Sequence, residues 1–313
     1  MSTPLLVIVG PTASGKTSLA CSLAGELAAE IVSADSQQCY RGLDAGTAKP
    51  TAEERARAPH HLLDVAEPEE QLDAARFVRL ADAAIADLVR RGKRAIVVGG
   101  TGLWIRALLR GLLDAPGASV EFRARFRADL EREGLPALHA RLAAVDPDAA
   151  RSIRLNDRVR VERALEVHAL SGRRLSDLQR EHAFNEERYS ARIVYLVPPR
   201  EVLQERIARR TRSLFESGEL AHETRWLLDR CERAPGARKA LKIIGYGEMA
   251  EALAGRCTRE EAEERVAART RQYAKRQRTW FTKDYGAPAA AWPPDAARLC
   301  VEAVQWYEGG SRR

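Results

Sequence analysis

The chain has 313 residues, of which 45% are hydrophobic and 30% are charged. This length allows one large domain or two ordinary ones, and the composition excludes bulk disorder. Lys and Arg number 51 against 44 for Asp and Glu, and the resulting net charge of +7 favours an anionic partner. No apolar run is long enough to span a membrane, so we expect a soluble, cytoplasmic protein. The five scattered cysteines contain no C-x-x-C pair, which argues against a disulfide framework or a zinc finger.

Strands and helices alternate in the first third of the chain. Residues 5–9 form a short apolar run with the pattern of a buried parallel strand. Leucines at helical spacing follow over 17–29, and residues 30–34 have the pattern of a second strand. A strongly amphipathic helix over 72–91 leads into a third strand over 94–98. Because such alternation builds parallel sheets with right-handed crossovers, the sequence predicts an α/β architecture.

The pattern then changes to helices alone. Residues 117–188 have helical periodicity throughout, and residues 192–197 return to strand character. We therefore predict a core made of residues 1–116 and 189–313, with 117–188 as an inserted helical subdomain. Further helices are expected in the C-terminal part of the core, over 200–216, 219–231, 246–254, 258–284 and 295–308.

A phosphate-binding motif follows the first strand. The sequence GPTASGKT fits G-x-x-x-x-G-K-[ST] in the required strand–loop–helix context. In such a loop, backbone N–H groups and the helix N-terminus bind phosphate, the lysine neutralises its charge, and the threonine hydroxyl can bind Mg²⁺. The alternative is a glycine turn that happens to precede a helix. The motif predicts a P-loop NTPase-like sheet core, and its residues are Gly10, Pro11, Thr12, Ala13, Ser14, Gly15, Lys16 and Thr17.

Asp35 is the only acidic residue that ends a predicted strand. P-loop proteins that hydrolyse nucleotides hold Mg²⁺ with an acid at the end of another strand, whereas the strand over 94–98 ends in Gly-Gly-Thr-Gly. Phosphoryl transfer is therefore poorly supported but stays an alternative. Asp35 lies at the sheet edge where ligands of open α/β sheets bind, so it could act as a general base. It could equally be a loop aspartate that binds its own backbone, and the residues alone leave the two open.

Six sequence blocks occur in an order that resembles one known family. They are GPTASGKT (10–17), SADSQQCYRGLDAGTAKP (33–50), PHHLLD (59–64), VGGTGLW (98–104), NDRVRVERALEV (156–167) and KIIGYGE (242–248). Over about residues 5–283 the chain resembles the tRNA isopentenyltransferases, also called tRNA dimethylallyltransferases, in their shorter bacterial form. The resemblance implies transfer of a dimethylallyl group from dimethylallyl diphosphate to the exocyclic amine of the adenine 3′-adjacent to the anticodon. The P-loop would hold the diphosphate.

The resemblance also implies roles for particular residues. Asp35 matches the family's catalytic aspartate, which takes the proton of the adenine amine. Arg210 matches an arginine that contacts the pyrophosphate, whereas we expect Arg206 to lie on a solvated helix face. Thr101 and Arg123 match positions that contact the target nucleotide, although Thr101 could also be a helix cap. The expected catalytic residues are therefore Asp35, Thr101 and Arg210, with Thr17 on Mg²⁺.

Several segments are predicted to contact the tRNA. The residues after Asp35 carry amide side chains that can read a base edge, and Lys49 either contacts a phosphate or is exposed. Residues 269–283 hold six basic residues and no acid, interleaved with Tyr273, Trp280 and Phe281. This pattern suits an RNA backbone with stacked bases, and taken alone it equally suits a solvated helix whose aromatic side chains face the core. In a tRNA enzyme, which the resemblance implies, we expect it to contact the anticodon stem. The predicted tRNA contacts are Asp35, Ser36, Gln37, Gln38, Thr101, Arg123, Val159, Arg160, Val161, Glu162, Arg163, Lys242, Lys275, Arg276 and Arg278.

The predicted partners are the tRNA anticodon stem-loop and dimethylallyl diphosphate, with Mg²⁺ as cofactor and no obligate protein partner. The first alternative is an adenylate isopentenyltransferase that uses a free nucleotide, and the helical insertion and the basic C-terminal helix argue against it. A P-loop small-molecule kinase is the second alternative. The third is a non-catalytic RNA-binding module, which would not need a complete P-loop with Asp35 opposite it.

Overall fold

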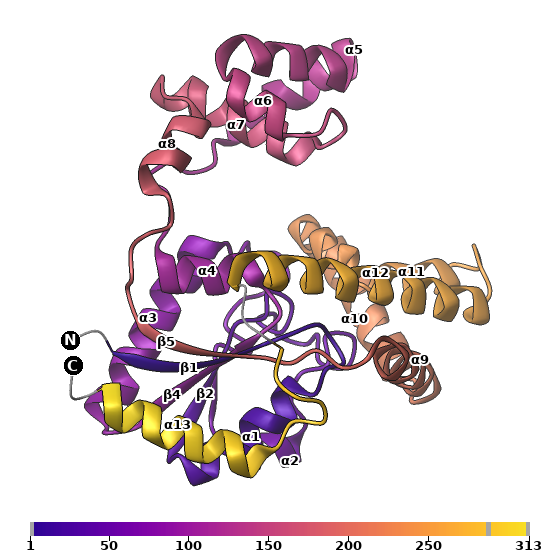
Figure 1. Cartoon of the computed structure of the whole chain (residues 1–313). Coiled ribbons are helices and arrows are strands. Elements are labelled where there is room, and N and C mark those ends of the chain that lie inside the picture. The colour runs from indigo at the N-terminus through magenta and orange to yellow at the C-terminus, as the bar shows by residue number, and fades with distance from the viewer. Residues whose placement is uncertain (1–2, 286–288, 311–313) are drawn as a thin grey trace. The chain divides into compact units, whose positions relative to one another are not determined.

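Within residues 3–285 and 289–310, which the computed structural model describes, a parallel sheet of five strands forms the centre of the larger unit (Figure 1). The strands lie in the order β3-β2-β4-β1-β5, and neighbouring strands pair in parallel. This confirms the predicted α/β fold class. The strands are β1 (Pro4–Val9), β2 (Ala29–Ser33), β3 (His60–His61), β4 (Arg94–Gly99) and β5 (Ser190–Tyr195).

The apolar run of β1 occupies the middle of the sheet. Residues 5–9 are at most 1% exposed, because helices cover both faces of the sheet. A strand buried on both faces needs a continuous apolar run rather than alternating polar residues, which is what the sequence provides. Leu6 is in register with Ile96 of β4 on one side and Arg192 of β5 on the other.

One face of the sheet is covered by α1 (Lys16–Glu26) and α13 (Ala296–Gly310), as Figure 1 shows. Leu6 and Ile8 of β1 pack into the cluster that these helices form with the sheet. The Tyr307 hydroxyl on α13 accepts a hydrogen bond from the Leu6 N–H at 3.1 Å and donates one to the Ala95 carbonyl at 2.9 Å. The C-terminal helix is thereby fixed to two strands of the core.

The opposite face is covered by α3 (Ala74–Arg90), α4 (Gly102–Arg110) and the end of α12 (Arg259–Tyr285). Asp73 caps the N-terminus of α3, and its side chain accepts a hydrogen bond from the Arg76 N–H at 2.8 Å. Phe77 of α3 and Trp104 of α4 stack at 4.5 Å between ring centroids. This packing fixes the start of α4 next to the end of β4, where Thr101 lies.

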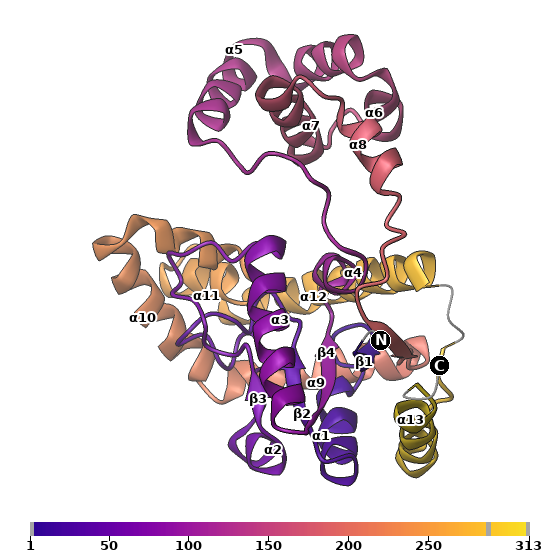
Figure 2. The same cartoon turned by 90° about the vertical axis from the view of Figure 1, so that its left-hand side faces the viewer.

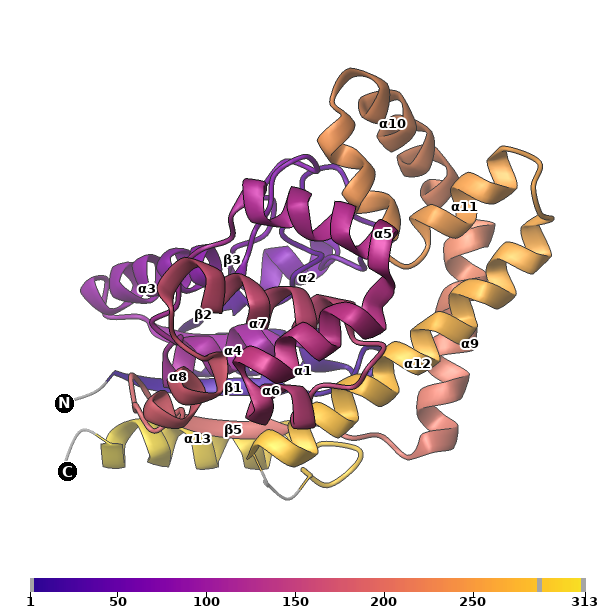
Figure 3. The same ribbon diagram turned by 90° about the horizontal axis from the view of Figure 1, so that it is seen from above.

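Three further helices of this unit are α9 (Arg200–Glu216), α10 (Glu219–Arg233) and α11 (Tyr246–Leu253). In Figure 3, α9 and α11 lie beside α12, and α10 packs against α11. Leu203 and Ile207 of α9 pack directly against Ala274 of α12. Because α9 follows β5 and α12 returns across the sheet, these two helices bring distant parts of the sequence to the exit of β1.

The described chain divides into two compact units, residues 1–109 with 188–313 and residues 110–187. The second unit was expected over 117–188. It consists of α5 (Val120–Val145), α6 (Pro147–Ser152), α7 (Arg158–Ser171) and α8 (Leu175–His182), around a core that includes Phe126, Leu142 and Val161. The helix α5 is broken at Gly134, whose φ of 77° is left-handed.

The structure contains short elements that we did not predict. The helix α2 (Ala52–Arg57) lies next to α1 (Figure 2), and it is held by a capping box between Thr51 and Glu54. The two-residue strand β3 adds an edge strand to the sheet beside β2, and residues Pro235–Lys242 form a 3-10 helix. Among the described residues, no helix is both long and apolar enough to cross a membrane.

Candidate active site

The P-loop connects β1 to α1 and adopts a conformation that its glycines permit. A Cβ atom at Gly10 would lie 2.4 Å from the Leu196 carbonyl oxygen, so the close approach of the loop to the end of β5 needs glycine there. Gly15 has a left-handed φ of 88° at the start of α1. This turn leaves the first N–H groups of α1 facing the space beyond the strand, where an anion can accept their hydrogen bonds.

Lys16 is half-buried at the start of α1. Its Nζ donates a hydrogen bond to the Pro11 carbonyl oxygen at 2.7 Å, which folds the side chain back over the loop. Burial lowers the pKa of Lys16 to about 8, with Asp35 opposing this change and Arg210 adding to it. The ammonium group is thus poorly compensated by the protein, and a bound diphosphate would stabilise its charge.

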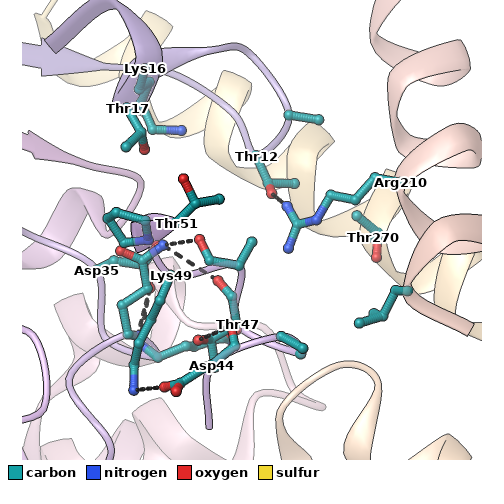
Figure 4. A pocket seen from close by; sticks show the side chains of 18 of the residues that line it. Thr12, Lys16, Thr17, Asp35, Asp44, Thr47, Lys49, Thr51, Arg210 and Thr270 are labelled. Atoms are coloured by element: carbon teal, nitrogen blue, oxygen red, sulfur yellow. Dashed lines mark hydrogen bonds and ion pairs between the residues drawn. The ribbon is translucent and has the colours of Figure 1, made fainter. Parts of the chain in front are cut away.

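Two arginines of α9 contact the P-loop from the other side. The Nη1 of Arg210 donates to the Thr12 Oγ1 at 3.1 Å (Figure 4), and burial lowers the pKa of Arg210 against the opposing effect of Asp35. One turn earlier, the Nη1 of Arg206 lies 3.5 Å from the Ala13 carbonyl oxygen, and its guanidinium stacks over Trp292 at 4.8 Å. The expected solvated position of Arg206 is therefore wrong, because the P-loop and an aromatic ring cover it.

Asp35 follows β2 and borders the same cavity as Lys16. Its Oδ1 accepts hydrogen bonds from the backbone N–H groups of Gln37 at 2.9 Å and Gln38 at 3.4 Å. For this carboxylate oxygen, the structure shows the second expected arrangement, an aspartate that binds the backbone of its own loop. Within the described part of the chain, no hydrogen bond occupies the other oxygen, Oδ2. One oxygen fixes the orientation and the other can accept a proton.

Thr101 joins the loop after β4 to the loop after β2. Its Oγ1 accepts the Ser36 N–H at 2.9 Å and donates to the Ser36 Oγ at 3.2 Å. Its carbonyl oxygen accepts the Trp104 N–H at 3.0 Å at the start of α4. Thr101 therefore links the two loops through its hydroxyl, directly beside Asp35.

A cavity of about 900 Å³ lies beside these residues in the larger unit (Figure 4). Cationic, carboxylate and aliphatic side chains all line it. Such a mixture suits a ligand with a charged head and a small apolar group. The polar lining includes Thr12, Lys16, Thr17, Asp35, Gln37, Gln38, Arg210, Tyr273 and Gln277, and the aliphatic lining includes Ile207, Leu214, Ile244 and Val266.

This chain is similar to known proteins of one family. Residues 38–284 match the family described as IPP transferase. The chain is 55% identical over 295 residues to a tRNA dimethylallyltransferase of Anaeromyxobacter dehalogenans (strain 2CP-C), covering 94% of this chain and 97% of that protein. The chain belongs to the IPP transferase family. It is also 50% identical over 297 residues to a tRNA dimethylallyltransferase of Myxococcus xanthus (strain DK1622), covering 94% of each protein.

Solved structures of the family have the same fold. The full-length tRNA isopentenylpyrophosphate transferase of Bacillus halodurans matches with a TM-score of 0.71 and 36% identity, over 99% of this chain and 98% of that one. A eukaryotic dimethylallyltransferase acting on tRNA matches with a TM-score of 0.82 and 27% identity, over 98% of this chain and 80% of that one. The expected family is therefore confirmed.

Lys49 of this IPP transferase is buried rather than exposed. Its Nζ lies 2.5 Å from a carboxylate oxygen of Asp44 and of Asp64, and it donates to the Tyr40 carbonyl oxygen at 2.6 Å. The nearby amide of Gln38 donates to the Ala48 carbonyl oxygen at 2.8 Å. Lys49 therefore fixes the loop that borders the cavity and is not available to a phosphate.

The basic stripe of α12 has an outer and an inner side. Lys275 and Arg276 are exposed and Arg278 is half-buried, so these predicted tRNA contacts are accessible. The interleaved aromatic side chains were expected to stack on RNA bases, and this prediction is wrong for Phe281, which is fully buried in the sheet cluster. Trp280 packs under Arg106 of α4 at 4.7 Å. Tyr273 lines the cavity.

The predicted tRNA contacts at the start of α7 lie in the second unit. The Val161 side chain is fully buried in that unit's core, so the prediction that it contacts tRNA is wrong. The fully buried Glu166 pairs with Arg123 at 3.0 Å and with Arg163 at 2.8 Å. Both arginines therefore have a structural partner, and both stay more than 30% exposed. Of the other predicted contacts, Val159, Arg160 and, in the larger unit, Lys242 are exposed, and Glu162 is half-buried.

Proposed function

We propose that this IPP transferase is a tRNA dimethylallyltransferase. It transfers a dimethylallyl group from dimethylallyl diphosphate to the exocyclic amine of the adenine 3′-adjacent to the anticodon, and it releases diphosphate. The observation that carries the proposal is the single cavity that brings the P-loop and Arg210 together with the carboxylate of Asp35. The relatives named tRNA dimethylallyltransferase and the eukaryotic enzyme acting on tRNA support the same substrates.

The P-loop and α9 bind the diphosphate of the donor. The N-terminus of α1 offers N–H groups and partial positive charge, and Lys16 and Arg210 supply two cations at its mouth. When the bond between the allylic carbon and the bridging oxygen breaks, negative charge grows on the diphosphate. Cations that are already in place stabilise this charge without reorganisation, so they lower the barrier of the transfer step.

Mg²⁺ fits this site by the chemistry of its donors. The ion usually keeps several waters and is held by one or two protein groups together with substrate phosphates. The described residues contain no cluster of three or more His, Cys, Asp or Glu side chains that could hold a metal by itself. Thr17 lines the cavity next to Lys16, so its hydroxyl and the phosphate oxygens would share the ion, which would neutralise part of the diphosphate charge.

Asp35 accepts the proton of the acceptor amine. The lone pair of an exocyclic adenine amine is delocalised into the ring, so the nitrogen must lose a proton as its bond to carbon forms. The hydrogen bonds to Oδ1 hold the carboxylate in place, and Oδ2 is left to receive that proton. Thr101 lies beside Asp35 and orders the loop through Ser36, which places both groups at the acceptor side of the cavity.

The exposed basic side chains bind the RNA. Lys275 and Arg276 on α12 suit phosphate contacts, and Arg160 in the second unit is likewise exposed. Sequence-specific RNA binding favours bases that are splayed out of a loop. The target adenine therefore leaves its stack and enters the cavity, where Asp35 lies.

The test is incubation of the protein with bulk tRNA and labelled dimethylallyl diphosphate. The proposal expects label in RNA and release of an equal amount of diphosphate. Label found only in free adenine nucleotide would instead indicate an adenylate isopentenyltransferase. Transfer of phosphate from ATP to an added acceptor, without prenyl transfer, would indicate a kinase.

A further inference from the structure

Gln277 of α12 is a buried amide that joins two loops of the active site. Its side-chain Oε1 accepts a hydrogen bond from the backbone N–H of Thr12 in the P-loop at 2.8 Å. Its Nε2 donates to the carbonyl oxygen of Gly100, after β4, at 2.9 Å. The residue is 5% exposed and borders the cavity. Gln277 was not among the predicted site residues, because nothing in the local sequence distinguishes it from other glutamines.

The two hydrogen bonds need a side chain that carries both a donor and an acceptor. An amide carries an acceptor and a donor on one rigid plane, so it can satisfy an N–H group of one loop and a carbonyl group of the other. A carboxylate could bind only the Thr12 N–H, and an aliphatic side chain could bind neither group. The contact is also close: a Cβ atom at Gly100 would lie 2.1 Å from the Gln277 Nε2. Gly100 therefore leaves the space that the amide fills.

The two loops carry the two halves of the proposed reaction. The P-loop holds the donor, and its Thr12 also accepts the hydrogen bond from Arg210. The residue after Gly100 is Thr101, which binds Ser36 directly beside Asp35 on the acceptor side. Gln277 is thus the link that sets the spacing between donor and acceptor groups.

We propose that Gln277 is a positioning residue that holds the donor loop and the acceptor loop at the distance needed for transfer. The proposal rests on the proposed function, because it assigns the donor to one loop and the acceptor to the other. Group transfer depends steeply on this distance, and a misplacement of about 1 Å can cost about 100-fold in rate. Loss of the bridge should therefore lower the rate of the bound complex more than the affinity for either substrate.

The experiment compares Gln277→Leu and Gln277→Glu with the wild type and with Gln204→Glu. Gln204 is an exposed glutamine of α9 without a role in the site, so its variant is the matched control. The single-turnover rate of prenyl transfer is measured with saturating donor and tRNA, together with both dissociation constants and the melting temperature. We expect the rate of Gln277→Leu to fall about 100-fold, with dissociation constants within a few-fold of wild type.

The Gln277→Glu variant allows a second test, the dependence of its transfer rate on pH. This test also replaces the first if Gln277→Leu does not fold. Burial raises the pKa of a carboxyl group, and a protonated Glu can again donate to Gly100 while it accepts from Thr12. The ratio of its rate to that of the wild type should therefore rise as the pH falls from about 8 to 6. Dividing the rate of the variant by that of the wild type cancels the pH effects of the other titratable groups. The Gln204→Glu ratio should stay constant.

Two results would overturn the proposal. One is a saturated single-turnover rate within about threefold of wild type for Gln277→Leu, even if its melting temperature falls, because that identifies a residue that only stabilises the fold. The other is a rate ratio for Gln277→Glu that does not change with pH. Labelling of tRNA by the wild type in the same assay checks the proposed function separately, so its failure is distinguishable from a failure of the role of Gln277.

Discussion

Asp35→Asn separates the chemical role of the aspartate from its structural role. In the structure, Oδ1 accepts the N–H groups of Gln37 and Gln38, and an Asn side chain keeps an oxygen that can accept both bonds. The substitution replaces Oδ2 by an NH₂ group, which cannot take a proton from the adenine amine. The loop should therefore keep its shape while the proposed base is lost.

The expected size of the effect follows from general-base catalysis. A positioned base contributes about 10²–10⁴-fold to the rate, or about 2.7–5.5 kcal/mol of transition-state free energy. The loss should appear in the single-turnover rate at saturating donor and tRNA, because proton acceptance matters only as the new bond forms. Binding of tRNA should change far less than the rate.

A second effect of Asp35→Asn concerns Lys16. Burial lowers the pKa of Lys16 to about 8 and the carboxylate of Asp35 partly offsets this, so its removal lowers that pKa further. Donor affinity in the variant should begin to fall at a lower pH than in the wild type. The measurements are single-turnover rates, donor titrations across pH, and a melting temperature. A variant that reacts within a few-fold of wild type would refute the assignment of Asp35 as the base.

The remaining predictions concern three parts of the molecule. Lys16→Ala should weaken donor binding and strongly lower the transfer rate, with tRNA affinity nearly unchanged. In the wild type, donor affinity should fall as the pH rises through about 8, because the ammonium group of Lys16 loses its proton. Donor titrations check both predictions. Replacement of Lys275, Arg276 and Arg278 by Ala should weaken tRNA binding and reduce the log–log salt slope by about 2 to 3, and an unchanged slope would show that this helix does not touch the RNA. Although burial alone would raise the pKa of Glu166, hydrogen bonds from Arg123, Ser119 and Arg163 lower it, so its contribution to stability is present at neutral pH and is lost as the pH falls through its lowered folded-state value. Glu166→Gln should therefore lower the melting temperature at pH 7 and reduce its dependence on acidic pH; equal melting curves at pH 7 would contradict this.

The parts of the site that depend on local sequence were predictable. The P-loop needs its glycines, lysine and threonine at fixed spacing, and a continuous apolar run before it can only be a strand buried on both faces. The aspartate after β2 was predictable as a cavity residue because parallel strands end at the same sheet edge. The helix α2 was also detectable, since Thr51 and Glu54 have the spacing of a capping box at its start.

The parts that depend on tertiary packing were not predictable from local patterns. Phe281 in a basic segment looks like a stacking residue, and only the packing of α12 on the sheet shows that it faces the core. Arg206 has the same sequence character as its neighbours on α9, yet it covers the P-loop because α9 follows β5 at the exit of β1. Gln277 likewise contacts Thr12 across 265 positions of the sequence. Charge and periodicity indicate which residues share a helix face, but they do not indicate which part of the fold that face packs against.

The charges around the cavity fit the proposed reaction, in which the donor and the base share one site. Lys16 and Arg210 both have lowered pKa values because burial disfavours their charged forms, and Asp35 opposes the change in each. A diphosphate that binds between them supplies the negative charge that the protein provides only in part, so these cations favour binding of the anion. In the proposed transfer, the growing charge on the leaving diphosphate meets the same cations. The proton released by the amine meets the carboxylate oxygen of Asp35 that the loop does not use. In the proposed reaction, the incomplete neutralisation of the free site is therefore what favours both donor binding and the transfer step.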